Sequence, residues 1–144
     1  MRNLFGPASV KNIISRVTGG SASWIDGKLV STIPSASLHF LNPAGVMLGL
    51  NSSLDINGTF NLNTERYLKM SDAELLGSDI SEDLYPHGII LDGTVGNAGK
   101  IGLQGPDYEI KTEYGRQVGA NLFHSFEQFN ILSGESAAFQ EMIL

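Results

Sequence analysis

The sequence predicts an all-β fold of short strands joined by tight turns. Short apolar runs rich in β-branched and aromatic residues recur along the chain, which is typical of strands. Asn and Gly separate these runs at intervals too short for helices, and the 17 glycines among 144 residues exceed the roughly 7% average. A parallel β-helix and a β-sandwich both match this pattern, because the strand spacing is too irregular to decide between them.

Length and composition indicate one domain and exclude several classes of function. A chain of 144 residues is long enough for one core and short for two, so we treat 1–144 as a single domain. Nine Lys and Arg residues without a cluster, with a formal net charge of −6, give no basic surface for nucleic acid. No apolar run approaches the roughly 18 residues of a membrane span, and the chain has no cysteine for disulfides or thiolate sites. We therefore expect no nucleic-acid binding and no membrane insertion.

The beginning of the chain does not resemble a signal peptide. Residues 1–12 (MRNLFGPASVKN) contain one early Arg, but no apolar core of about 7 to 15 residues and no small-residue cleavage site. The sequence as it stands therefore indicates a cytoplasmic chain or an isolated domain.

The first half of the chain is predicted to form strands on both sides of one tight turn. The predicted strands are residues 10–17, 24–33 with a break at Asp26-Gly27, 38–41, 46–48, 54–56 and 59–62. The turn is 42–45 (NPAG), in which Pro43 suits the second position of a type I or II turn and Gly45 can supply a positive φ. The turn has either a structural role or a role in recognition by a partner protein, and its residues are compatible with both.

Residues 71–86 (SDAELLGSDISEDLYP) differ from the rest of the chain, because they carry five acidic residues and no basic residue. Ser71 and Glu74 have the spacing of a helix capping box, which predicts a turn or two of helix through Leu76. We interpret the segment as an exposed acidic linker between residues 1–70 and residues 87–144.

The second half returns to the pattern of short strands. Strands are predicted at residues 88–91, at 108–112 as an edge strand, and in 130–143 with a turn at Ser133-Gly134. The apolar positions of residues 117–129 (QVGANLFHSFEQF) also fit a helical stripe. Gly119 and the β-prone flanks lead us to predict extended structure there.

The histidines and acidic residues do not form a catalytic or metal-binding pattern in the sequence. His39, His87 and His124 lie far apart and have no partner at metal-ligand spacing, so no metal site and no cofactor are expected. Asp26, Asp55 and Asp92 lie beside or near glycine, as is typical of aspartates in turns. Some β-helix polysaccharide lyases gather carboxylates on one face, but here the acidic residues concentrate in the linker, which holds five of the 15, so we predict no enzyme.

Four blocks of the sequence resemble the filamentous haemagglutinin N-terminal domain, the secretion module of two-partner-secretion exoproteins. The blocks are residues 12–20 (NIISRVTGG), 25–34 (IDGKLVSTIP), 41–60 (LNPAGVMLGLNSSLDINGTF) and 121–139 (NLFHSFEQFNILSGESAAF). The resemblance implies a right-handed parallel β-helix (solenoid) with short capping strands. It also implies a secreted or cell-surface adhesin or haemagglutinin, exported through the periplasm after its non-enzymatic secretion domain is bound by the periplasmic domains of an outer-membrane transporter.

The sequence departs from the family in one signature and in the order of its blocks. The family's NPNG signature appears here as NPAG, and its NPNL signature has no match. The family's first blocks, including 92–99 and 121–130, come last in this chain. Joining Phe139 to Gly6 would restore the family order, so the chain resembles a circular permutant. Residues 1–70 then correspond to the family's C-terminal blocks and 87–144 to its N-terminal blocks, within one chain or by segment swapping between chains.

The resemblance assigns candidate residues for transporter recognition to two segments. Each has a structural alternative, a plain turn in the first and buried aromatics that hold a cap onto the core in the second. The candidates are Asn42, Pro43, Ala44, Gly45, Asn121, Leu122, Phe123, His124 and Phe126. The second functional hypothesis is a β-solenoid interaction module, for self-assembly or carbohydrate binding, that has lost the export role.

Overall fold

A computed structural model describes residues 9–64, 67–69, 88–96 and 98–141. Within these residues the protein is all-β, with parallel sheets and a single short 3-10 helix, η3 (Thr112–Tyr114). The strands are β1 (Asn12–Val17), β2 (Ser23–Ile25), β3 (Lys28–Ser31), β4 (Ser37–Leu41), β5 (Val46–Leu48), β6 (Ser53–Asp55), β7 (Phe60–Asn63), β8 (Tyr67–Lys69), β9 (Ile89–Leu91), β10 (Asp107–Ile110), β11 (Arg116–Val118), β12 (Asn121–Phe129) and β13 (Ser136–Phe139). No helix in the described part of the chain is long and apolar enough to cross a membrane.

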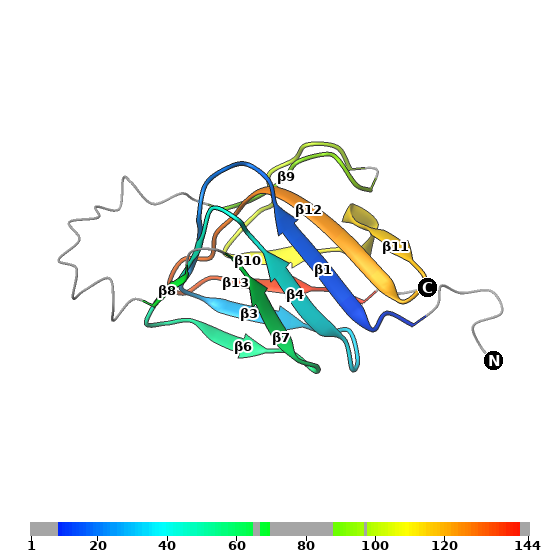
Figure 1. Cartoon of the computed structure of the whole chain (residues 1–144), viewed down its shortest axis with the longest axis horizontal. Coiled ribbons are helices and arrows are strands. Elements are labelled where there is room, and N and C mark those ends of the chain that lie inside the picture. The colour runs from blue at the N-terminus through cyan, green and yellow to red at the C-terminus, as the bar shows by residue number, and fades with distance from the viewer. Residues whose placement is uncertain (1–8, 65–66, 70–87, 97, 142–144) are drawn as a thin grey trace.

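Successive passes of the chain stack on one another and share three sheets (Figure 1). Sheet 1 has the strand order β11-β12-β1-β4-β7, sheet 2 the order β10-β13-β3-β6, and sheet 3 the order β2-β5-β8. β1, β2 and β3 form one pass, and each pairs in parallel with the equivalent strand of the next pass, β4, β5 and β6. β7 and β8 extend sheets 1 and 3 in the same way.

The pass that precedes β1 in space comes from the end of the chain. β12 pairs in parallel with β1 so that Asn121 lies opposite Asn12, and β13 pairs in parallel with β3. An isolated parallel bridge between Ile131 and Ile25 continues the same layer in sheet 3. The first and last parts of the chain therefore complete one another within a single chain. Gly6, whose distance from Phe139 would test the permutation directly, lies outside the described residues.

The outer side of that last pass is covered by antiparallel strands. β11 forms a hairpin with β12, and Gly119 takes the positive φ of +62° that the connecting turn requires. β9 also pairs antiparallel with β12, with a register shift between Phe126 and Gln128. β10 closes the corresponding end of sheet 2. One end of the stack is thus capped by strands of the second half.

The core lies between the three sheets and is centred on phenylalanine rings. Phe129 packs edge-to-face on Phe40 from β4 and on Phe126 from its own strand, with ring centroids 4.9 and 5.0 Å apart. The ring of Phe139 from β13 also stacks on that of Phe129, with centroids 6.3 Å apart. All four rings are fully buried, and this burial joins the two halves of the chain with about 1.5–3 kcal/mol of hydrophobic stabilisation for each side chain.

The structure confirms most predicted strands, and it shows three features that were not predicted. Residues 117–129 are extended as predicted, but Gly119 reverses the chain between β11 and β12, and this hairpin was not predicted. η3 and β8 were not predicted, since three residues are too few to give a periodic signal. The edge position of β10 is confirmed. The linker and its predicted helical turn, residues 71–86, lie outside the described residues.

Candidate recognition surface

The outer face of sheet 1 presents side chains from four adjacent strands. Because β-strands alternate sides, the residues that flank buried positions point outward. They align in rows across the sheet, since Ile14 lies opposite both Phe123 and His39, and His39 lies opposite Asn61. We call this surface the outer face, made of Asn12, Ile14, His39, Leu41, Asn61, Asn63, Asn121 and Phe123.

A chain of hydrogen bonds crosses the outer face from β7 to β12. The Asn61 amide approaches Nδ1 of His39 at 3.3 Å, and Nε2 of His39 approaches Oδ1 of Asn12 at 3.1 Å. Asn12 in turn donates from Nδ2 to Oδ1 of Asn121 at 3.1 Å. Because an amide nitrogen can only donate, His39 accepts at Nδ1 and donates at Nε2, so the chain runs in one direction. This chain of hydrogen bonds holds the four polar side chains in fixed positions on the exposed face of the sheet.

A groove of about 630 Å³ runs over this face. Its wall includes Ile14, Leu41 and the amides of Asn12 and Asn63, and no Asp, Glu, Lys or Arg is among the described residues that line it. A surface that combines half-buried apolar groups with fixed, uncharged hydrogen-bonding groups suits a macromolecular partner or a neutral polar chain.

The predicted turn at residues 42–45 lies directly after β4, next to this face. Asn42 is 1% exposed, and its side chain makes three hydrogen bonds. Oδ1 accepts from the Ala44 amide at 2.9 Å, while Nδ2 donates to the Ser21 carbonyl at 3.1 Å and to Oγ of Ser23 at 2.9 Å. Asn42 thus fastens the turn to the preceding pass of the chain.

The other three residues of the turn differ in access to solvent. Gly45 is buried and takes a φ of +127°, a conformation that favours glycine. Pro43 is exposed and Ala44 half-buried. Only these two present their side chains to a partner.

The candidates on β12 divide by strand alternation. Leu122, His124 and Phe126 point inward and are buried, whereas Asn121 and Phe123 lie on the outer face. Strand alternation predicts which of these side chains point inward and which point outward. The sequence alone did not assign them, because the apolar positions of this segment also fit a helical stripe. The structure brings Asn121 and Phe123 together with Asn12 and Ile14, which the sequence did not single out.

His124 is a buried structural histidine. Nε2 lies 3.1 Å from the Lys111 carbonyl, and the ring lies against those of Phe139 and Phe126, with centroids 5.5 and 6.0 Å away. Within the described residues, Nδ1 has no hydrogen-bond partner, and neither does Oγ of Ser15, which lies opposite in register. Burial lowers the pKa of His124 to about 4, only partly offset by the hydrogen bond to Lys111.

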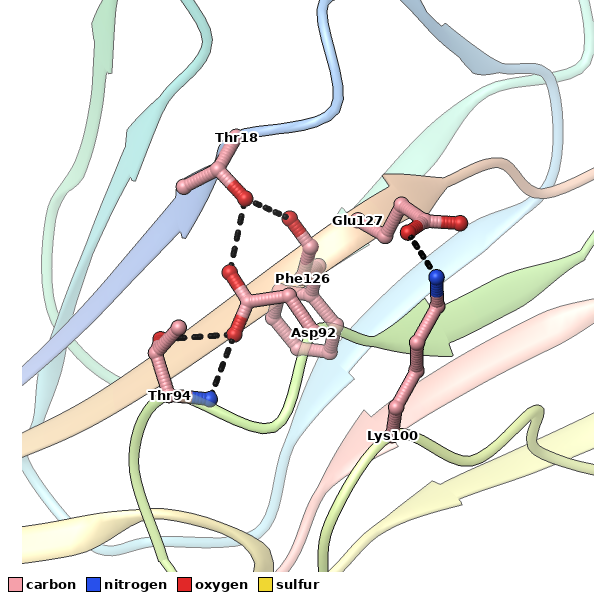
Figure 2. Close-up of polar contacts among 6 residues, drawn as sticks. All are labelled: Thr18, Asp92, Thr94, Lys100, Phe126 and Glu127. Carbon is pink, nitrogen blue, oxygen red and sulfur yellow. Dashed lines mark hydrogen bonds and ion pairs between the residues drawn. The ribbon is translucent and has the colours of Figure 1, made fainter.

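A second polar cluster fastens the loop after β9 to the end of β1 (Figure 2). One carboxylate oxygen of Asp92 accepts from the Thr94 amide at 2.9 Å and from its hydroxyl at 2.6 Å. The other accepts from Thr18 at 2.7 Å and from Ser125 at 2.5 Å. We call these four residues the Asp92 clasp.

Three further contacts reinforce the same region. Arg16 donates to Ser125 at 2.7 Å and to Thr94 at 3.0 Å, and Lys100 pairs with Glu127 at 2.6 Å (Figure 2). Partial burial raises the pKa of Asp92, but the hydrogen bonds from Ser125, Thr94 and Thr18 outweigh it and bring the pKa down to about 2. The clasp therefore holds an ionised carboxylate between the two halves of the chain.

Two other acidic residues of the described chain, Asp26 and Asp55, lie in separate places. Asp26 accepts the Asn51 amide at 2.8 Å in a loop, and Asp55 is exposed on β6. Among the described residues, no three His, Asp or Glu side chains are placed to hold a metal ion.

Comparison with known proteins gives one match. A model of the family described as the TPS secretion domain matches residues 5–78, which contain β1 to β8 and three of the four strands of the outer face. No curated protein and no solved structure matches the chain.

Proposed function

The chain belongs to the TPS secretion domain family, and on this premise we propose that it is a non-enzymatic recognition domain of an adhesin or haemagglutinin exported by two-partner secretion. Its partner in this proposal is the set of periplasmic domains of a dedicated outer-membrane transporter. The observation that carries the proposal is the family match, because it spans β1, β4 and β7 of the outer face.

The outer face is the part of the molecule best suited to this contact. It places Phe123 opposite Ile14, with Leu41 on the next strand, all three half-buried on a surface of hydrogen-bonded amides. Large apolar side chains at the centre of a patch usually supply most of the binding free energy at a protein interface. Pro43 and Ala44 extend the surface beyond the end of β4.

We further propose that the stacked sheets are the right-handed parallel β-helix of the family and that the chain is circularly permuted. The support is that β12 and β13, from the end of the chain, occupy the layer before β1 and β3. A reordered chain in which residues 88–141 precede residues 9–69 is expected to fold with an unchanged far-UV circular dichroism spectrum and melting temperature. A reordered chain that stays unfolded would contradict the permutation.

Binding to the transporter provides the test of the recognition role. The probe is the purified periplasmic part of the two-partner-secretion transporter from the same genome, immobilised for biolayer interferometry. Ile14→Ser and Phe123→Ser are expected to raise Kd about tenfold or more. Leu50→Ser, which changes an apolar residue 69% exposed outside the outer face, is the matched control and is expected to leave Kd unchanged.

All three variants are first compared with the parent protein by thermal melting. If both outer-face variants melt like the parent protein and bind with the parent Kd, the outer face is not the recognition surface. If the parent protein itself does not bind, the recognition role is wrong.

Carbohydrate binding is the second candidate function, and the uncharged groove favours it. Neutral sugars are bound by amide and imidazole groups over apolar surface, which the groove offers at Asn12, His39 and Ile14. Retention on a glycan array that His39→Ala abolishes would support this function. Transporter binding without glycan retention would exclude it.

A further inference from the structure

In the part of the chain that the structure describes, sheet 1 ends on an edge strand with no charged residue or proline, β7. Within the described residues, β7 pairs with β4 on one side and with no strand on the other. Exposed edge strands are usually protected by charged residues, proline or a bulge, because their free backbone groups otherwise pair with another chain. β7 (FNLN) has neither charge nor proline.

The backbone of β7 shows which groups face the open side. The carbonyls of Thr59 and Asn63 accept from the amides of Leu38 at 2.8 Å and Asn42 at 3.1 Å, so these residues face β4. Backbone groups alternate along a strand, so Phe60 and Leu62 direct their N–H and C=O groups to the open edge. Their side chains point inward, opposite the buried Leu38 and Phe40.

We propose that two copies of this chain associate through β7, as antiparallel strands related by a two-fold axis at Leu62. In this register the two Leu62 residues exchange both backbone hydrogen bonds. The inward side chains of the two copies then meet and extend the core across the edge, while Asn61 of each copy lies opposite Asn63 of the other.

The side chains of the outer face are complementary in this register. Asn61 already directs its amide nitrogen to His39 at 3.3 Å and to Thr59 at 3.3 Å, which leaves its carbonyl oxygen to accept. The exposed Asn63 of the second copy can donate to that oxygen, and symmetry makes the contact twice. A register centred on Asn61 would instead place two acceptor oxygens opposite each other.

The opposite edge of sheet 1 explains why the assembly closes as a dimer. There β11 runs antiparallel and carries the exposed Arg116, and it offers no copy of the β7 sequence. A two-fold contact through β7 uses the same surface on both copies and leaves no free β7 edge for a third. This inference does not depend on the proposed export role.

Sedimentation velocity of the full chain tests the dimer over a range of concentrations. The parent protein is expected to shift from monomer to dimer as concentration rises. Asn61→Lys with Asn63→Lys places like charges opposite each other in the dimer and is expected to raise its Kd about tenfold or more. Gln104→Lys with Val118→Lys adds the same charge elsewhere, with Val118 on the opposite edge strand, and is expected to leave Kd unchanged.

Cross-linking tests the register separately. The chain has no cysteine, so Leu62→Cys introduces a single thiol. Hydrogen-bonded antiparallel residues have Cα atoms about 5.5 Å apart, within the range of a disulfide. Mild oxidation is expected to give a disulfide-linked dimer with Leu62→Cys and none with Val118→Cys.

Three results would overturn the proposal. A parent protein that is monomeric at every concentration would mean that no second copy covers β7. A dimer that the two Lys variants leave equally stable would indicate another contact, such as exchange of segments between copies. Equal cross-linking of both Cys variants would exclude the register centred on Leu62.

Discussion

Replacing Asn42 by Ala separates a structural role of the NPAG turn from a recognition role. The side chain is 1% exposed and makes three hydrogen bonds, two of them to residues of the preceding pass. The substitution leaves the Ser21 carbonyl and the Ala44 amide without these partners. Each lost bond costs about 0.5–1.5 kcal/mol net, so the free energy of unfolding is expected to fall by about 3 kcal/mol.

This magnitude can be measured by urea denaturation at pH 7, followed by far-UV circular dichroism. A loss of about 3 kcal/mol lowers the ratio of folded to unfolded protein about 150-fold and the melting temperature by about 10 °C. Gln104→Ala is the control, because it truncates an exposed polar side chain and should change the free energy of unfolding by less than about 0.5 kcal/mol.

A loss below about 1 kcal/mol for Asn42→Ala would refute the structural assignment, because it would mean that these hydrogen bonds contribute little. The NPAG sequence would then be explained by contact with a partner. The expected result instead means that weaker transporter binding by this variant could not be assigned to a direct contact. Pro43→Ala, which changes an exposed residue, is the variant suited to that question.

Two further predictions concern pH, and each serves as a control for the other. Because the pKa of His124 is lowered to about 4 in the folded protein, the unfolded chain takes up the proton first. The free energy of unfolding is therefore not reduced by His124 above about pH 6.5, and it falls by up to about 3 kcal/mol as the pH drops towards 4. His124→Gln should remove this loss in urea titrations, and a variant that keeps the parent slope would show that another group is responsible. The pKa of Asp92 is lowered to about 2, so its contribution is complete above about pH 4 and is lost between about pH 4 and 2. After allowance for its partial exposure, this contribution is about 1 kcal/mol. Asp92→Asn should remove this contribution and leave the change in the free energy of unfolding between pH 6.5 and 4 intact. If the variant loses as much stability between pH 4 and 2 as the parent protein, Asp92 is not the responsible group.

Local sequence was sufficient for most of the strands and turns. The runs that became β4, β5 and β7 are apolar or alternating and are bounded by Asn and Gly, and these are properties of the strand itself. Extended structure was correctly predicted for residues 117–129 although their apolar spacing also fits a helix, but the reversal at Gly119 depends on the pairing of β11 with β12 and was not predicted.

The candidate site was less predictable than the fold. Phe123 and Phe126 are both aromatic and three positions apart, yet one lies on the outer face and the other in the core. Asn42 looked equally suited to a turn or to a partner, and its hydrogen bonds to Ser21 and Ser23 could not be inferred from residues so far away in the chain.

The sequence by itself therefore determined the all-β class, the turn residues and the family, because each is carried by short stretches of neighbouring residues. The tertiary structure alone decided that β12 lies beside β1, that Asp92 bridges Thr18 and Ser125, and that β7 is the last described strand of sheet 1. These facts depend on pairing and side-chain contacts between separate segments of the chain, which lie up to 109 residues apart for β1 and β12. Such pairing is selected by the burial of the whole core and not by the preference of any one strand.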